Sequence, residues 1–95
     1  MAVFAVTYVY GPDTEKRMGV RPAHREVLGR LYEEGTLLAA GPLEDELTPG
    51  GLLVFSAESK EEVEALLQQD PYAEAGVIEE TVIRSWTPVF GPFSA

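Results

Sequence analysis

Residues 36–57, TLLAAGPLEDELTPGGLLVFSA, contain two short apolar runs joined by an acidic, turn-rich segment. The runs at 36–40 and 52–57 are typical of β-strands bounded by glycine and proline. The segment between them carries three consecutive acidic residues, 44–46. This part of the chain therefore predicts two consecutive strands with only a turn between them.

A helix is expected on each side of these two strands. Residues 22–34 begin with a proline and end before a glycine, and their apolar residues recur at helical spacing, so a helix is predicted there. The preceding segment 11–20 is polar with two glycines and is expected to be a loop. On the other side, Ser59 and Glu62 form a capping box that opens a second helix, expected to end at Asp70.

The outermost segments complete the order of elements. Residues 2–10 (AVFAVTYVY) and 77–87 (VIEETVIRSWT) predict the first and last strands. The resulting order, β-α-β-β-α-β, is typical of an α+β, ferredoxin-like domain with an antiparallel four-stranded sheet and both helices on one face. Residues 1–95 are expected to form a single domain, with 88–95 as a C-terminal tail without regular structure.

Apolar residues make up 45% of the chain, which is more than one covered sheet face requires. In residues 3–6 (VFAV) and 52–55 (LLVF) every side chain is apolar, so both faces of the central strands are expected to be buried. Two helices cover only one face. The sequence therefore predicts a twofold homodimer in which the sheets of two copies pack face to face.

Charge and composition exclude several classes of function. The chain has 7 Lys and Arg against 16 Asp and Glu, a net charge of −9, which argues against nucleic acid and against an anionic membrane surface. Cysteine is absent and there is one histidine, so thiol chemistry and a multi-histidine zinc site within one chain are excluded. Because the chain lacks a long apolar run and a basic leader, a cytoplasmic protein is expected. No metal or other cofactor is expected.

His24 and Asp70 are the candidate catalytic residues. His24 lies within the apolar stripe of the first predicted helix, and Asp70 lies on the apolar side of the second. A buried polar side chain needs a partner. The two helices of this fold run antiparallel, so the start of the first lies beside the end of the second, and we expect His24 and Asp70 to meet there.

The expected positions of these two side chains also oppose the helix dipoles, by ~0.3–1 kcal/mol each. Such local conflicts concentrate at functional sites. In a catalytic pair, His24 would transfer a proton, Asp70 would orient the imidazole, and the helix N-terminus would favour its neutral form. The alternatives are a core histidine with a satisfied hydrogen bond and an ordinary Asp-Pro turn.

Four of the seven basic residues fall between positions 16 and 25, beside the one histidine. In an acidic chain this cluster is suited to attract an anionic small molecule. The alternative is that these side chains neutralise nearby glutamates. The topology brings the end of the second strand and the residue after Asp70-Pro71 to the same place. The expected binding residues are Arg17, Arg21, Arg25, Gly41, Pro42 and Tyr72.

Three segments, 21–24 (RPAH), 35–43 (GTLLAAGPL) and 70–77 (DPYAEAGV), resemble the YCII-related (YciI-like) proteins of the dimeric α/β-barrel superfamily. The resemblance extends over nearly the whole chain. It implies a ferredoxin-like protomer, a homodimer, and an active site built on a histidine and an aspartate that match His24 and Asp70. One branch that the chain resembles removes chloride from chlorinated hydroxyquinone intermediates, while most members have no assigned reaction.

Two hypotheses of different kinds follow. In the first, the protein is a cofactor-independent enzyme of lyase, isomerase or dehydrochlorinase type that acts on a small anionic or aromatic molecule. In the second, it is a non-catalytic dimeric protein that binds a small ligand or assists a neighbouring protein. Oxygen chemistry without a cofactor is a third alternative, with no particular residue behind it. An open pocket beside His24 would favour the enzyme, and dry packing around the imidazole would favour the second hypothesis.

Overall fold

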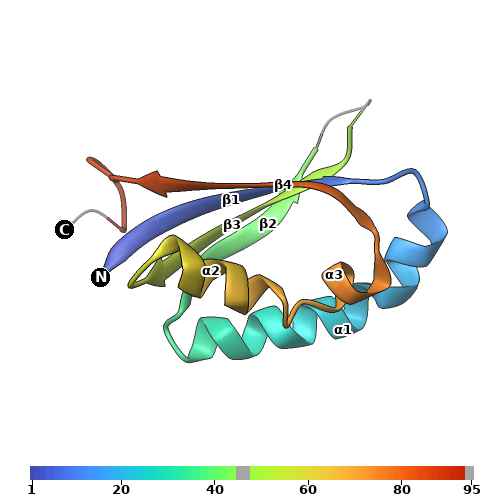
Figure 1. Cartoon of the computed structure of the whole chain (residues 1–95), viewed down its shortest axis with the longest axis horizontal. Coiled ribbons are helices and arrows are strands. Elements are labelled where there is room, and N and C mark those ends of the chain that lie inside the picture. Colours follow the sequence, from blue (N-terminus) through green and yellow to red (C-terminus); the bar gives the residue numbers. More distant parts are fainter. Residues whose placement is uncertain (45–47, 94–95) are drawn as a thin grey trace.

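The computed structural model describes residues 1–44 and 48–93. Within them, four strands form one antiparallel sheet in the order β2-β3-β1-β4 (Figure 1). This is the ferredoxin-like, α+β arrangement expected from the sequence, with the first and third strands at the centre. The strands are β1 (Ala2–Tyr10), β2 (Leu37–Leu43), β3 (Gly50–Ala57) and β4 (Ile78–Trp86).

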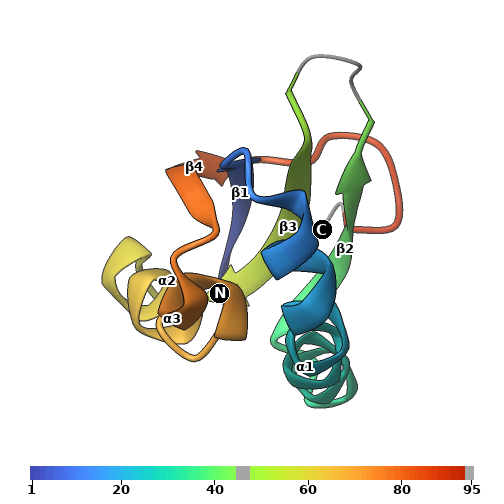
Figure 2. The same cartoon turned by 90° about the vertical axis from the view of Figure 1, so that its right-hand side faces the viewer.

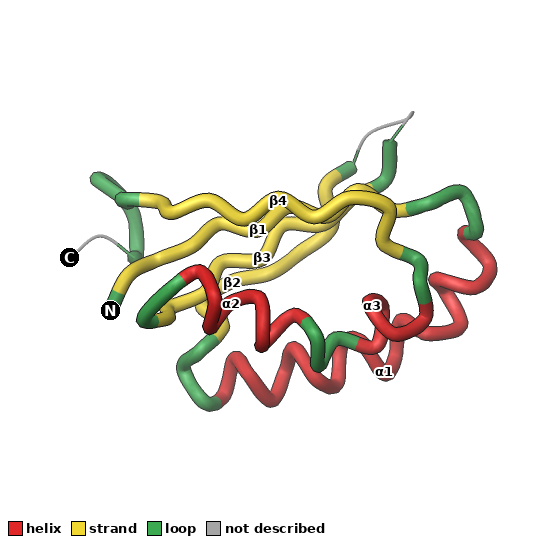
Figure 3. The backbone as a smooth tube through the Cα atoms, viewed as in Figure 1, coloured by secondary structure: helices red, strands yellow, loops and turns green. Residues whose placement is uncertain are grey.

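The helices of the described chain all pack on one face of this sheet (Figures 1 and 3). They are α1 (Thr14–Glu33), α2 (Lys60–Leu67) and the short α3 (Pro71–Ala75). Figure 2 shows α1 below β2 and β3, with α2 and α3 below β1 and β4. Ser59 caps α2 as predicted, because its hydroxyl accepts a hydrogen bond from the N–H of Glu62 at 3.2 Å. None of the described helices is long and apolar enough to cross a membrane.

The first helix begins at Thr14 and not at Pro22, so the loop predicted over 11–20 is confined to residues 11–13. The side chain of Asp13 caps the helix by accepting a hydrogen bond from the N–H of Lys16 at 3.0 Å. Pro22 therefore lies inside a 20-residue helix. The added residues 14–20 are exposed except at Arg17 and Val20, and they carry mostly polar side chains and a glycine, so they show no apolar periodicity.

The structure describes only part of the β2–β3 hairpin and of the C-terminal tail. β2 continues to Leu43, beyond the predicted strand end, because its backbone stays paired with β3 through the Gly-Pro step. Asp45 and Glu46 of the predicted acidic turn lie outside the described residues. Residues 88–93 of the tail form neither helix nor strand, and 94–95 also lie outside the described residues.

The core lies between the sheet and the helices. Alternate residues of β1 face the helices, and the antiparallel register places Phe4 opposite Phe55 and Val6 opposite Leu53 on the same side. Val63 of α2 closes this layer and is fully buried. Each such side chain stabilises the fold by ~1.5–3 kcal/mol when it leaves water. The same alternation places Tyr8 and Tyr10 on the helix side of the sheet at the end of β1.

The opposite face of the sheet carries no helix of the described chain (Figure 1). The tail reaches this face at the end of β4, where the ring of Phe93 lies edge-on to Trp86 with centroids 6.4 Å apart. It carries apolar side chains from three strands, among them Val9 of β1, Leu52 of β3 and Val82 of β4. Leu52 is 36% exposed and Trp86, at the end of β4, is 41% exposed. This is the face on which the sequence predicts a second copy of the chain.

Candidate functional site

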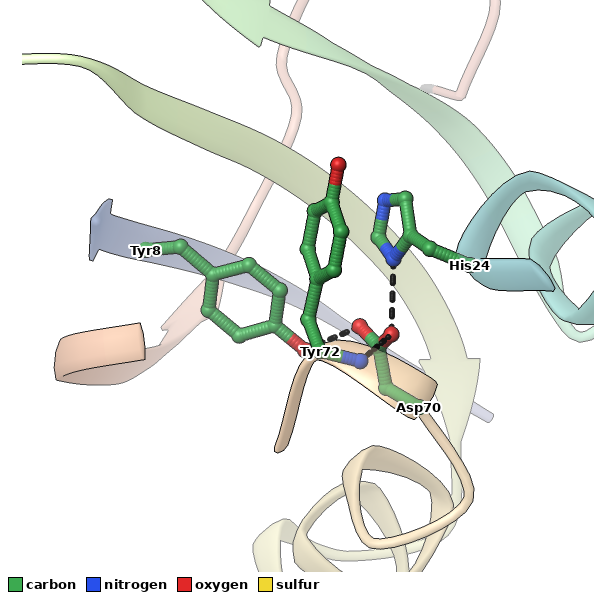
Figure 4. Close-up of polar contacts among 4 residues, drawn as sticks. All are labelled: Tyr8, His24, Asp70 and Tyr72. Carbon is green, nitrogen blue, oxygen red and sulfur yellow. Dashed lines mark hydrogen bonds and ion pairs between the residues drawn. The ribbon is translucent and has the colours of Figure 1, made fainter. Parts of the chain in front are cut away.

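The structure brings His24 and Asp70 into contact at the end of the molecule where α1 and α3 meet. Nδ1 of His24 lies 2.7 Å from Oδ1 of Asp70 (Figure 4). Both residues are buried, with 8% and 2% of their surfaces exposed. Because the carboxylate accepts, Nδ1 carries the proton in the neutral imidazole, and Nε2 is left as the acceptor.

Asp70 is held by two further donors. The Tyr8 hydroxyl donates to Oδ2 at 2.8 Å, and the Tyr72 N–H donates to Oδ1 at 3.0 Å. These bonds satisfy a carboxylate that would otherwise be costly to bury. The arrangement fixes the carboxylate, and the carboxylate in turn fixes the ring of His24.

Two details of the predicted site geometry are wrong. Asp70 does not end the second helix, since α2 stops at Leu67, and it is instead the N-cap of α3. There its charge agrees with the helix dipole. His24 lies about three turns into α1 because that helix starts at Thr14, so the helix N-terminus does not act on the imidazole. The two side chains still meet because α3 turns back against α1.

Tyr72 stacks on the imidazole of His24. The ring centroids are 3.7 Å apart and the planes differ by 6°. In Figure 4 the free ring nitrogen of His24 and the hydroxyl of Tyr72 point to the same side, away from Asp70. Burial raises the pKa of Tyr72, so its hydroxyl stays protonated at neutral pH. The pair therefore presents a proton acceptor and a hydrogen-bond donor side by side.

Sequence reasoning missed two tyrosines of β1. The sequence pattern of Tyr8 is that of a core residue, and the structure adds its hydrogen bond to Asp70. Tyr10 lies edge-on to Tyr72, with ring centroids 5.4 Å apart. Its pKa is raised to about 12, chiefly by burial. The signal available in the sequence was their alternation with Phe4 and Val6, which places both tyrosines on the helix side, at the end of β1 nearest the start of α1.

The buried hydroxyl of Tyr8 predicts a loss of stability at alkaline pH. Burial, followed by the negative charge of Asp70, raises its pKa well above the ordinary 10.0. A raised folded-state pKa gives stability that is fully present below pH 10 and is lost as the pH rises further. We expect the free energy of unfolding to fall above that point by about 1.4 kcal/mol per pH unit from this residue. The free energy of unfolding would be measured with urea at several pH values between 9 and 11.5. For Tyr8→Phe it should fall less steeply with pH than for the wild type. Equal slopes would show that Tyr8 ionises freely in the folded protein.

A cleft of about 1070 Å³ opens beside His24, between α1 and the β2 edge of the sheet. Its walls come from α1, β2, the start of β3, Tyr10 and Tyr72. Asp70 is not part of the wall and acts through His24. All six residues predicted to bind a ligand contribute to the lining: Arg17, Arg21, Arg25, Gly41, Pro42 and Tyr72.

The three arginines of the lining differ in burial. Arg17 is buried and its guanidinium lies over the ring of Tyr10, 4.8 Å from the centroid. Arg21 is half-buried, and its Nη1 lies 3.7 Å from Sδ of Met18. Arg25 is exposed. Within residues 1–44 and 48–93 none of the three forms an ion pair with a carboxylate, so the alternative of charge neutralisation by nearby glutamates is not observed there.

No group of three or more His, Asp or Glu residues suited to a metal occurs in the described ranges. The polar groups in and behind the cleft include the imidazole of His24, the carboxylates of Asp70 and Glu44, tyrosine hydroxyls and the arginines. These groups are suited to proton transfer and to binding an anion.

The profile of the YCII-related domain family matches residues 2–87. The chain belongs to this family. It is 39% identical to the protein YciI of Escherichia coli over 84 residues, covering 80% of this chain and 86% of YciI. It is 37% identical over 75 residues to the derivative of benzaldehyde biosynthesis cluster protein C of Emericella nidulans, covering 70% and 76% of the two chains.

Solved structures support the same fold. The 5-chloro-2-hydroxyhydroquinone dehydrochlorinase TftG of Burkholderia phenoliruptrix AC1100, in complex with 2,5-dihydroxybenzoquinone, superposes with a TM-score of 0.77 at 24% identity. That match covers 98% of this chain and 99% of TftG. An antibiotic biosynthesis monooxygenase superposes with a TM-score of 0.59 at 12% identity, over 95% of this chain and 100% of the other. At these identities the likeness shows the shared fold.

Proposed function

We propose that this protein is a cofactor-independent enzyme that uses His24 and Asp70 for general acid–base chemistry on a small molecule. The observation that carries the proposal is the 2.7 Å contact between His24 Nδ1 and Asp70 Oδ1 at the wall of an open cleft. It commits one ring nitrogen to the carboxylate and leaves the other to accept a proton from a ligand. The open cleft favours the enzyme over a histidine packed in a dry core.

In the proposed reaction, Nε2 of His24 takes a proton from an acidic C–H or O–H group of the substrate. The electron pair left behind either expels a leaving group from a neighbouring carbon or, after a shift of the double bond, takes the proton back at another atom. Asp70 stabilises the imidazolium during this step. The Tyr72 hydroxyl donates a hydrogen bond to the substrate oxygen that gains negative charge. The imidazolium then releases its proton to the leaving group or to water.

The fold shared with TftG suggests which of these reactions to test first. TftG is named for removing chloride from a chlorinated hydroxyhydroquinone. Elimination of HCl needs a base for the proton and an environment that accepts the departing anion. His24 and the arginine-lined cleft provide both here, so we place phenolic and quinol substrates that bear a leaving group first.

Turnover by metal-free protein tests this proposal. The protein would be dialysed against EDTA and assayed on a panel of chlorinated and unsubstituted hydroxyquinols and phenolic acids, in H₂O and in D₂O. We expect turnover without added cofactor, with solvent deuterium entering substrate or product wherever a C–H proton is exchanged. Binding without turnover or exchange across the panel would contradict the enzyme and support the alternative, a non-catalytic ligand-binding or accessory protein.

We also propose that the protein is a homodimer formed through the face of its sheet that carries no helix. Val82 of β4 points to that face, and its neighbour Thr81 points to the helix side. We expect sedimentation of a species of twice 10.4 kDa, and a monomer for Val82→Arg, because the new charge would be buried between the sheets. Thr81→Arg, which adds the same charge on the other side, should remain dimeric. A wild-type monomer, or equal behaviour of the two variants, would contradict the proposed interface.

A further inference from the structure

Arg17 is buried in the wall of the cleft, and one end of its guanidinium has no polar partner among the described residues. It is 9% exposed, yet its Nη1 makes no hydrogen bond to any described residue. No carboxylate of the described chain forms an ion pair with it. Buried guanidinium groups are normally paired and hydrogen-bonded. In a chain with a net charge of −9, a buried arginine without an acidic partner among the described residues is suited to pair with a bound anion.

Aromatic contacts hold this guanidinium in place. It lies over the ring of Tyr10 at 4.8 Å, Tyr10 is edge-on to Tyr72 at 5.4 Å, and Tyr72 stacks on His24 at 3.7 Å. Gly51 leaves room for this arrangement, because a Cβ there would lie 2.7 Å from the Tyr10 hydroxyl oxygen. Arg17 is thus connected to the proton-transferring residue through two rings. A guanidinium fixed in this way is suited to a planar oxyanion, to which it offers two parallel donors.

The helix sets the distance between the two groups. Arg17 and His24 are seven residues apart on α1, which is two turns and about 10 Å along the axis, and both side chains line the same cleft. A ligand that reaches both would be about the length of one aromatic ring with its anionic substituent. The tyrosine rings that line the cleft favour a flat, conjugated molecule over an aliphatic one.

We propose that Arg17 is the anion-binding residue of the site and that the substrate is a small conjugated acid, with a carboxylate or ionised hydroxyl at Arg17 and its reacting atom at His24. This rests on the proposed function and names the substrate class. Arg21 and Arg25 lie nearer the solvent and attract the anion, whereas Arg17 orients it. The cleft would therefore select its ligand by negative charge and by flat shape together.

Benzoate and benzamide are a matched pair of probes, because they have nearly the same shape and differ in charge. Their affinities would be measured by calorimetry for the wild type, Arg17→Met, and the control Arg30→Met, an exposed arginine of α1 outside the cleft. We expect the wild type and Arg30→Met to bind benzoate at least tenfold more tightly than benzamide. Arg17→Met should bind the two within twofold. Equal affinities in the wild type, or a preference that survives Arg17→Met, would overturn the inference.

Two further variants keep the result interpretable. If Arg17→Met does not fold, Arg17→Lys retains the charge but loses the planar pair of donors, and its preference should fall at least threefold; an unchanged preference would overturn the inference. His24→Gln should keep the preference for benzoate, because the anion is held two turns away. A retained preference without turnover on any substrate would remove the proposed enzyme and leave the anion site. Turnover that depends on His24, with a preference independent of Arg17, would do the reverse.

Discussion

His24→Gln is expected to lower kcat/KM by about 10²–10⁴-fold on any substrate that the protein turns over, because it removes the group that accepts the proton. Glutamine is similar in size and can still donate a hydrogen bond to Asp70, so the local packing is retained. The loss should fall mainly on kcat, since His24 acts when the proton moves and not when the ligand binds. Steady-state kinetics on the substrate found in the panel measures both constants.

Glu26→Gln is the matched control for this variant. Glu26 lies two residues further along α1, is exposed, and does not line the cleft. It should retain wild-type kinetics, and thermal unfolding should show that both variants are folded. A His24→Gln protein with more than half of the wild-type kcat would exclude His24 as the proton acceptor and remove the proposed mechanism.

Asp70→Ala is expected to lower the free energy of unfolding by about 3–5 kcal/mol. The carboxylate accepts hydrogen bonds from Tyr8, His24 and the backbone of Tyr72, and all three donors would be left buried without it. A total of this size is a large part of the stability of a small domain. Urea unfolding at neutral pH measures the change, and the dependence of the free energy on urea concentration should be the same for the wild type and the variant.

Asp13→Ala separates this effect from the loss of a helix cap. Asp13 is also an N-cap aspartate, but it is exposed, and among the described residues its side chain accepts one hydrogen bond, from the N–H of Lys16. Its removal should cost about 1 kcal/mol. If Asp70→Ala destabilises the protein no more than Asp13→Ala does, Asp70 is a cap and its bonds to His24 and Tyr8 contribute little.

Topology made the contact between His24 and Asp70 predictable from the sequence. The strand order followed from two consecutive strands between two helices, and this order brings one end of each helical segment together. Once both polar residues were placed on apolar faces, the need to pair buried polar groups left few other partners for them. The prediction of the contact therefore did not depend on accurate helix boundaries, and it is present although two of those boundaries were wrong.

The rest of the site could not be predicted because it depends on local choices with weak sequence signals. The start of α1 is set by one aspartate cap in a polar segment, which also reads as a loop. Asp70 before a proline is compatible with a turn, a helix end or a new cap, and only the packing of α3 against α1 decides among them. Tyr8 has the pattern of a core residue, and its hydroxyl bond depends on a carboxylate 62 residues away.

The tautomer of His24 is the most direct test of the proposed chemistry, and the chain has no other histidine to confuse its signals. Nitrogen-15 NMR of the imidazole in its neutral form distinguishes a protonated Nδ1 from a protonated Nε2. We predict that Nδ1 carries the proton, held by Asp70, and that Nε2 is free to accept one from a ligand in the cleft; Asp70→Ala should lose this preference. A proton on Nε2 in the wild-type protein would contradict the account, because the nitrogen that faces the substrate would then be unable to act as a base.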